Sequence, residues 1–333
     1  MVTGSTMSDQ THELLFLSRA DIESVNLPMN DIIDCVEEAF RHKGTRDFEM
    51  PPKPGIHPAP DAFIHAMPAY LPKLRTAGMK WVSGFPENVK RGLPYISGLL
   101  ILNDPDTGLP VAVMDAAWIT AKRTGAATAV AAKYLARKES KIFGILGCGV
   151  QGRSNLEALH NVLKNLEEVR AYDISKTKLQ AYVDEMTARF GLTIKPVDSP
   201  RDAVQGSEVI VTSGPILKKP SPTIERSWIN DGIFACPIDF DSYWKPDAMR
   251  SMHKFCTDDT EQLHYYRSIG YFQDIPKVYA DLDQIVLGRK PGREDKQERI
   301  MSMNLGLAIE DMAVAARLLE KARKLGIGRW LQL

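Results

Sequence analysis

The sequence feature that most constrains the fold is the run Gly147-Cys-Gly149-Val-Gln-Gly152. An apolar stretch, Ile142–Leu146, precedes this run, and a segment with apolar residues at helical spacing follows it. This order is typical of a dinucleotide-binding turn. The first glycine allows a tight turn, the second lets a pyrophosphate approach the backbone, and the third lets the helix pack on the strand. Free N–H groups at the start of that helix would bind the phosphates.

An acidic residue at the end of the next predicted strand indicates which dinucleotide binds. A carboxylate at Asp173 would bond both ribose hydroxyls and repel a 2′-phosphate, so the sequence predicts NAD(H). Lys176 and Lys178 lie nearby in the sequence and keep NADP(H) as the alternative. The other cofactor contacts predicted around the turn and after a later strand are Val150, Gln151, Thr212 and Ser213.

From residue 140 onward, strands and helices alternate. This alternation predicts an α/β fold with a doubly wound parallel sheet and helices on both of its faces. The predicted helices span 150–164 and 176–190. The predicted strands span 141–146, 169–173, 193–197, 208–213, 232–238 and 254–257.

The residues before 140 have a different pattern. A short extended piece and a helix come first, and the seven prolines between 50 and 72 predict an ordered loop with short strands. Apolar stretches at 98–103 and 110–115 flank an Asp/Gly turn and predict a β-hairpin, preceded by a strand at 78–85. We expect helices at 117–137 and again over the last 30 residues, where Gly326 would end the helix.

Charge and composition exclude several classes of partner. The 42 basic and 42 acidic residues balance, so the chain has no net charge that would attract nucleic acid or an anionic membrane. No apolar run approaches the ~20 residues of a membrane span, and the polar N-terminus does not resemble a signal peptide. The four cysteines form no C-x-x-C pair, which predicts reduced thiols, no metal site and a cytoplasmic protein.

Three motifs before the glycine run carry a family resemblance: Gly78-Met-Lys80-Trp, Asp104-Pro-Asp-Thr-Gly108 and Thr120-Ala-Lys-Arg123-Thr-Gly. In this order, and together with the glycine run, they resemble the ornithine cyclodeaminase/mu-crystallin family from about residue 14 to residue 328. The resemblance implies a Rossmann domain inserted into an α+β substrate-binding and dimerisation domain, and a homodimer. We expect the first domain to comprise 8–137 plus 312–333, and the inserted domain 138–311.

The resemblance also implies roles for single residues. Lys80 and Arg123 match residues that hold the substrate carboxylate, which suits an ammonium and a guanidinium, and Lys80 is counted as catalytic. Asp239 matches the catalytic aspartate, with Asp241 in reserve; without the resemblance it would be a surface acid on a loop. The remaining expected contacts are Lys53 for the carboxylate, Met67 for the substrate and Thr124 for the cofactor phosphates.

Two departures from the family pattern bear on the substrate. His65 stands where ornithine-specific members have a glutamate, which removes the partner of a second ammonium. The run after Asp239 also differs from that of cyclodeaminases. We therefore predict an NAD(H)-dependent oxidoreductase that acts on the CH–NH2 or C=N carbon of a small 2-amino or 2-imino acid. The alternatives are an ornithine cyclodeaminase that recycles NAD internally and a non-catalytic, nucleotide-dependent binding protein.

Overall fold

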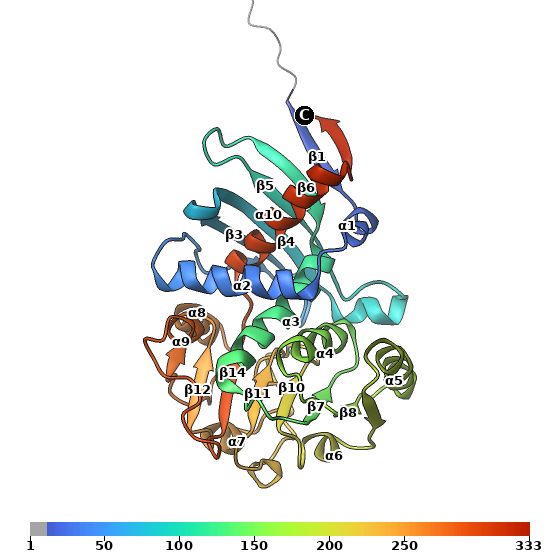
Figure 1. Cartoon of the computed structure of the whole chain (residues 1–333), viewed down its shortest axis with the longest axis vertical. Helices are drawn as coiled ribbons and strands as arrows, with labels where there is room; N and C mark the ends of the chain where they lie inside the picture. The colour runs from blue at the N-terminus through green and yellow to red at the C-terminus, as the bar shows by residue number, and fades with distance from the viewer. Residues whose placement is uncertain (1–11) are drawn as a thin grey trace, which may run out of the picture.

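The computed structural model describes residues 12–333, in which two β-sheets lie one above the other with helices between them (Figure 1). The predicted polar lead-in and the expected domain start at residue 8 lie outside the described residues. Within 12–333, no helix has both the length and the apolar character needed to cross a membrane.

The first sheet has the strand order β15-β1-β6-β5-β4-β3-β2. All its neighbouring strands are antiparallel except β1 and β6, which are parallel. The predicted hairpin is confirmed as β5 and β6. The strands are β1 (Glu13–Leu17), β2 (Gly55–Ile56), β3 (Phe63–Leu71), β4 (Thr76–Gly84), β5 (Ile96–Asn103), β6 (Pro110–Asp115) and β15 (Arg329–Gln332).

The prediction of a loop with short strands over 50–72 was wrong, because β3 is a continuous nine-residue strand. Pro68 lies in its middle and pairs with Met79 of β4. On the other edge of β3, the two-residue strand β2 reaches only Ile64 and His65. The missing N–H of Pro68 therefore falls where the neighbouring strand has already ended, a position that tolerates proline.

The second sheet is parallel throughout and has the order β13-β12-β14-β11-β10-β7-β8-β9. The predicted doubly wound sheet is confirmed, but β13 and β14 were missed, and β14 lies between β11 and β12. The strands are β7 (Ile142–Leu146), β8 (Glu168–Tyr172), β9 (Thr193–Pro196), β10 (Val209–Thr212), β11 (Phe234–Pro237), β12 (Lys254–Thr257), β13 (Ala280–Asp281) and β14 (Ile300–Met303).

The strand order of the second sheet reverses between β7 and β10. The chain runs outward through β8 and β9 on one side and through β10 and β11 on the other. In sheets of this kind ligands bind outside the carboxyl ends of the strands at this reversal. The glycine run follows β7 and therefore lies at that position.

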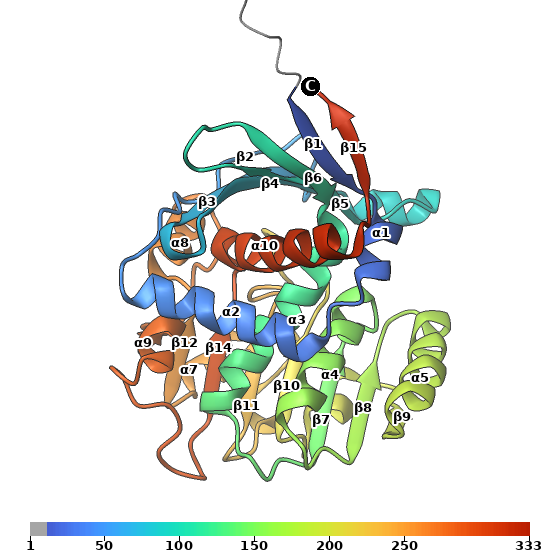
Figure 2. The same cartoon turned by 45° about the horizontal axis from the view of Figure 1, so that its top comes forward.

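Helices join the two sheets. In Figure 2, α10 lies directly beneath the first sheet and above α2, and α3 descends from there toward the second sheet. The helices are α1 (Arg19–Val25), α2 (Met29–Gly44), α3 (Ala116–Leu135), α4 (Val150–Val162), α5 (Lys176–Phe190), α6 (Pro200–Val204), α7 (Pro246–Arg250), α8 (Thr260–Ser268), α9 (Leu282–Val286) and α10 (Ala308–Leu325), with 3₁₀ turns at Pro72–Leu74, Pro86–Arg91 and Arg226–Trp228.

Candidate active site

The glycine run has the local geometry that its spacing predicts. Gly147 has φ +99°, a conformation that side-chain-bearing residues rarely adopt. A methyl group at Gly152 would clash with the carbonyl oxygen of Gly147, whereas a methyl group at Gly149 would meet nothing within 4 Å. The turn therefore needs glycine at its first and third positions for its own packing. The open space at Gly149 leaves room for a ligand.

The start of α4 is free to bind an anion. Gly149 precedes its first residue, Val150, and provides no side-chain hydrogen bond to the first turn. Two buried side-chain oxygens near this helix, Oε1 of Gln151 and Oγ1 of Thr120 on α3, have no hydrogen-bond partner within 12–333. Thr124 lies one turn beyond Thr120 and donates back to its carbonyl oxygen at 2.7 Å. These features fit a bound dinucleotide phosphate.

The structure brings two more predicted residues to the glycine turn. The Asp173 carboxylate accepts hydrogen bonds from the Cys148 N–H and the Ser175 N–H, both at 2.8 Å. The Ser213 hydroxyl donates to the Gly147 carbonyl at 2.8 Å. An apolar residue that the sequence reasoning missed, Ile174, follows Asp173 and is 91% exposed.

Lys176, expected near the cofactor, has a carboxylate partner at the protein surface. Its ammonium forms an ion pair with Asp198 at 2.7 Å, and both side chains are mostly exposed. The structure thus gives Lys176 a surface partner and does not commit it to the cofactor.

Asp239 is fully buried and is not the surface acid that the bare sequence suggested. The Thr212 hydroxyl donates to its Oδ1 at 2.6 Å, and the Gly214 N–H donates to its Oδ2 at 2.8 Å. Burial raises the pKa of Asp239 to about 7, although both hydrogen bonds act to lower it. Thr212, predicted as a cofactor contact, holds the aspartate in this structure.

The residue after Asp239 has an unusual backbone conformation. Phe240 is buried and has φ +63°, a left-handed conformation that is rare for a bulky residue. Its ring packs among the rings of Tyr266, Tyr271 and Phe272. This packing offsets the backbone strain and fixes the turn that carries the aspartate.

The three predicted carboxylate-binding cations come from different elements and are all buried. Lys80 lies on β4, opposite Met67 of β3, and Arg123 lies on α3. Lys53, from the segment before β2, donates to the carbonyl oxygens of Leu305 at 2.7 Å and Gly306 at 3.0 Å.

Gly306 brings Lys53 and Arg123 together. Lys53 bonds its carbonyl oxygen, while a methyl group on its Cα would lie 2.5 Å from Nη1 of Arg123. Gly306 also has φ +80°. Both the conformation and the close approach require glycine at this position.

Two acids that the sequence reasoning missed compensate these cations. Asp311 accepts from Nε of Arg123 at 3.0 Å with Oδ1, and its Oδ2 lies 2.7 Å from Nζ of Lys80. Glu310 accepts from Nη1 of Arg123 at 3.0 Å. Both acids lie in the first turn of α10 and are fully buried.

Burial and mutual repulsion shift the titration of this cluster. Burial and the Arg123 charge lower the pKa of Lys80 to about 7 and that of Lys53 to about 8. Burial raises the pKa of Glu310 to about 7 and that of Asp258, which accepts from the Gly306 N–H at 2.7 Å, to about 6. The cluster therefore titrates near neutral pH.

His65 is an uncharged member of the site. It lies on the same face of β3 as Met67, two residues away, and its ring stacks on Phe63 with centroids 4.3 Å apart. Burial and the Lys53 charge lower the pKa of His65 to about 3. The ring of His57 lies nearby, with its centroid 6.1 Å from that of His65.

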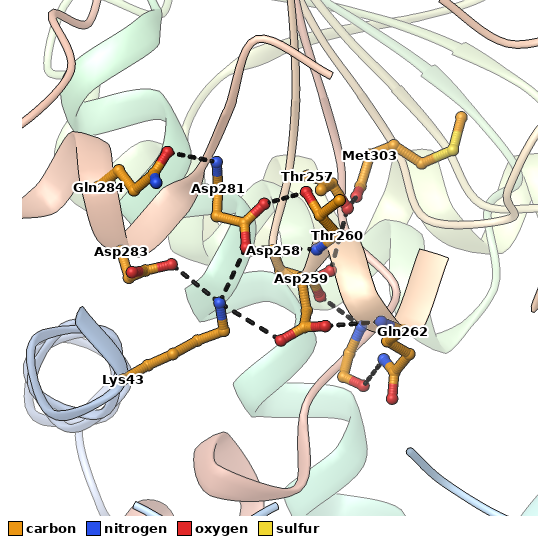
Figure 3. A network of polar contacts seen from close by, with 11 residues as sticks. Lys43, Thr257, Asp258, Asp259, Thr260, Gln262, Asp281, Asp283, Gln284 and Met303 are labelled. Carbon is orange, nitrogen blue, oxygen red and sulfur yellow. Dashed lines mark hydrogen bonds and ion pairs between the residues drawn. The ribbon is translucent and has the colours of Figure 1, made fainter. Parts of the chain in front are cut away.

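A second polar network surrounds the ammonium of Lys43 (Figure 3). Lys43, at the end of α2, extends between three carboxylates of the second sheet's helices and loops. Its Nζ lies 3.3 Å from Asp259, 3.1 Å from Asp281 and 2.9 Å from Asp283. Although burial acts to lower it, these carboxylates raise the pKa of Lys43 above its ordinary value.

This network reaches Gly306 through Gln262. Asp259 accepts from the Gln262 N–H at 2.6 Å, and the Gln262 side-chain amide donates to the Gly306 carbonyl at 3.2 Å. The glycine that contacts both Lys53 and Arg123 is thus also bonded to the Lys43 network.

The parallel sheet, its strand-order reversal and the glycine turn define a dinucleotide-binding protein of the Rossmann class. The match to a family model covers residues 12–325. The chain belongs to the ornithine cyclodeaminase/mu-crystallin family, as its motifs predicted.

Known relatives align over almost the whole chain. The nodulation efficiency protein NfeD of Rhizobium meliloti is 37% identical over 316 residues, which cover 94% of this chain and 97% of the relative. The structure of Thermococcus litoralis Δ1-pyrroline-2-carboxylate reductase in complex with NADH and L-proline matches with a TM-score of 0.86 and 34% identity, over 95% of this chain and 99% of that chain. An archaeal alanine dehydrogenase dimer with bound NAD matches with a TM-score of 0.85 and 34% identity, over 96% and 99%.

Proposed function

We propose that this protein is an NAD(H)-dependent oxidoreductase acting on the CH–NH2 or C=N carbon of a small 2-amino or 2-imino acid. The observation that carries the proposal is that the protein buries both an aspartate, Asp239, held by the Gly214 N–H next to the residue that bonds the glycine turn, and a cluster of Lys53, Lys80 and Arg123. A pyrroline-2-carboxylate reductase bound to NADH and L-proline, and an alanine dehydrogenase bound to NAD, share this fold.

Each residue type suits its proposed role. Lys80, Arg123 and Lys53 would hold the substrate carboxylate and so orient the α-carbon. Asp239, with its pKa near neutrality, would accept a proton from the substrate ammonium in the oxidative direction and return it in the other. Bound NAD(H) would supply the hydride chemistry. Met67 and His65 would line the side-chain end of the substrate.

The cofactor would be NAD(H), because the Asp173 carboxylate at the end of β8 would meet a 2′-phosphate of NADP(H) with like charge. The two hydrogen bonds it accepts from the backbone fix the carboxylate at the turn. The residues proposed to hold the dinucleotide are Thr124, Gly147, Gly149, Val150, Gln151, Gly152, Asp173 and Ser213.

We do not propose ornithine cyclodeamination. A second ammonium beside His65 would meet an uncharged imidazole, with the Lys53 ammonium close enough to affect its titration. Such a group has no favourable partner there.

The test is an NADH-absorbance screen. L-amino acids are offered with NAD, and 2-oxo acids with ammonia or methylamine, or cyclic imino acids, are offered with NADH. We expect turnover that disappears in Asp239→Asn while NADH binding is retained. Ammonia release from L-ornithine without net NADH change would favour a cyclodeaminase instead. A ligand that binds only with nucleotide and is never turned over would indicate a binding protein.

We also propose a homodimer. Trp81 and Leu99 pair across β4 and β5, and they are 43% and 48% exposed on the sheet face opposite α10. An exposed apolar sheet face of this kind is typical of an interface, and the related alanine dehydrogenase is a dimer. Leu99→Arg should yield a monomer in light scattering; an unchanged mass would exclude this face.

The domain division also stays a proposal, with one adjustment. The predicted boundary at residue 312 falls inside α10, a single helix packed on the first sheet, so we place the boundary before Ala308. We propose a cytoplasmic location because the four cysteines are all free, with Cys35 partly buried and the other three buried, as reducing compartments favour.

A further inference from the structure

The cations of the carboxylate-binding cluster are already neutralised by acids of the protein itself. Asp311 contacts both Arg123 and Lys80, and Glu310 contacts Arg123 from the other side. Asp258 is the third buried acid and lies close enough to Lys53 to influence its titration. Three buried basic side chains thus face three buried acids, and the cluster is neutral when all six groups are charged.

A substrate carboxylate would add a fourth negative charge to this cluster. Donors remain for it, because the carboxylates contact Arg123 only through Nε and Nη1 and contact Lys80 through a single oxygen. A net charge in a buried space is costly unless it is compensated. One proton taken up by the cluster would restore neutrality.

We propose that Glu310 is a positioning residue that takes up this proton, so that the substrate carboxylate and a proton enter the site together. This inference rests on the proposed function. Protonated Glu310 no longer neutralises Arg123, and the guanidinium is then free to pair with the substrate. Asp311 stays ionised and keeps Arg123 and Lys80 in place.

The contacts single out Glu310 among the three acids. Its Oε2 accepts from Arg123, while its Oε1 is buried and has neither a hydrogen-bond nor an ion-pair partner within 12–333; Oδ2 of Asp311 also has no hydrogen-bond partner there but lies 2.7 Å from Nζ of Lys80. Protonation of Asp311 would weaken ion pairs to two cations. Protonation of Asp258 would weaken the hydrogen bond that holds the Gly306 N–H.

The surroundings of Glu310 also favour its protonation near neutral pH. The charged groups that face it are Arg123 from α3, Asp258 after β12 and Asp311 from its own helix. Burial and the two acids raise its pKa to about 7, against the Arg123 charge. Lys53 also lies close enough to Glu310 for that carboxylate to influence its titration, and Lys80 of β4 contacts the neighbouring Asp311.

The test measures proton uptake on binding of pyrrole-2-carboxylate, a planar monoanion, to the NADH-saturated protein. Calorimetric titrations at pH 8 in phosphate and in Tris, buffers with different ionisation enthalpies, give the number of protons taken up. We expect about one proton per site, and a dissociation constant that rises about tenfold per pH unit above the pKa of Glu310. Binding without proton uptake would overturn the inference and leave the proposed function intact.

Variants locate the proton. Glu310→Gln should bind the probe at pH 8 more tightly than the wild type and without proton uptake. Uptake that persists in this variant would assign the proton to Lys80 or Lys53, whose pKa values also lie near 7 and 8, and would overturn the assignment to Glu310. Glu320→Gln, an exposed acid on the same helix, should behave like the wild type. Asp239→Asn should keep the uptake, and its loss there would overturn the assignment to Glu310. If neither probe binding nor amino-acid turnover is found, the proposed function fails, and this inference fails with it.

Discussion

The Thr212 hydroxyl offers a direct way to shift the titration of the proposed catalytic acid. It donates to Oδ1 of Asp239 at 2.6 Å and therefore stabilises the ionised form. Thr212→Val keeps the shape of the side chain and removes the donor. A hydrogen bond to a charged group contributes about 1.5–3 kcal/mol, and one pKa unit corresponds to about 1.36 kcal/mol. The pKa of Asp239 should thus rise from about 7 by about one to two units.

The assay is the pH dependence of kcat/KM for amino-acid oxidation, in which Asp239 must be ionised to accept a proton. Because activity in this direction rises with pH through that pKa, the profile of Thr212→Val should move to higher pH by the same one to two units. The plateau at high pH should be largely retained.

Thr212→Ser is the matched control, because it keeps the hydroxyl and should keep the wild-type profile. The indole N–H of Trp244 also donates to Thr212 at 3.3 Å, so thermal unfolding is measured in parallel to separate stability from titration. An unchanged or lower pKa in Thr212→Val, with intact folding and NAD binding, would refute the reasoning.

Three further predictions concern the cofactor turn and the network in Figure 3. Gly152→Ala should lower the melting temperature, because its methyl group clashes with the backbone. Gly149→Ala should keep the melting temperature of the wild type but bind NADH at least about tenfold more weakly. Equal melting temperatures of the two variants would contradict this prediction. Lys43→Met leaves three carboxylates unpaired and should cost about 3–5 kcal/mol in urea unfolding, a loss that Lys43→Arg should largely avoid. Asp173→Ser should admit NADPH, and continued strict selection of NADH would place cofactor discrimination elsewhere.

The features predicted correctly from the sequence are those set by neighbouring residues. The spacing of residues along a short stretch of chain was enough to predict the glycine turn, the hairpin of β5 and β6, and the helix α5. The family resemblance then placed Lys53, Lys80 and Arg123 in one site, although the positions span 53 to 123 in the chain. Periodicity by itself gave no reason to place them together.

The features that were missed depend on contacts distant in sequence. β14 has four residues and follows a loop without periodicity, so its place between β11 and β12 is decided by the sheet. The sequence analysis did not single out Glu310 and Asp311. A signal was present, since the residues around them from 308 to 315 are otherwise apolar on every side. A helix whose first turns are apolar on every side is buried there, so acidic side chains in those turns must lie inside the protein.

The pairing of β15 with β1 has a consequence for the order of folding during synthesis. Glu13 pairs with Gln332, and α10, which fills the space under the first sheet, follows the whole of the second sheet in the chain. The strands of the second sheet leave the ribosome as a nearly uninterrupted series, while β1, which can pair early with β6, must wait for its other partner, β15, made more than 300 residues later. A nascent chain that ends before α10 should therefore acquire its nucleotide-binding turn first, and Arg123 and Lys80 should remain without their internal counter-charges until α10 emerges.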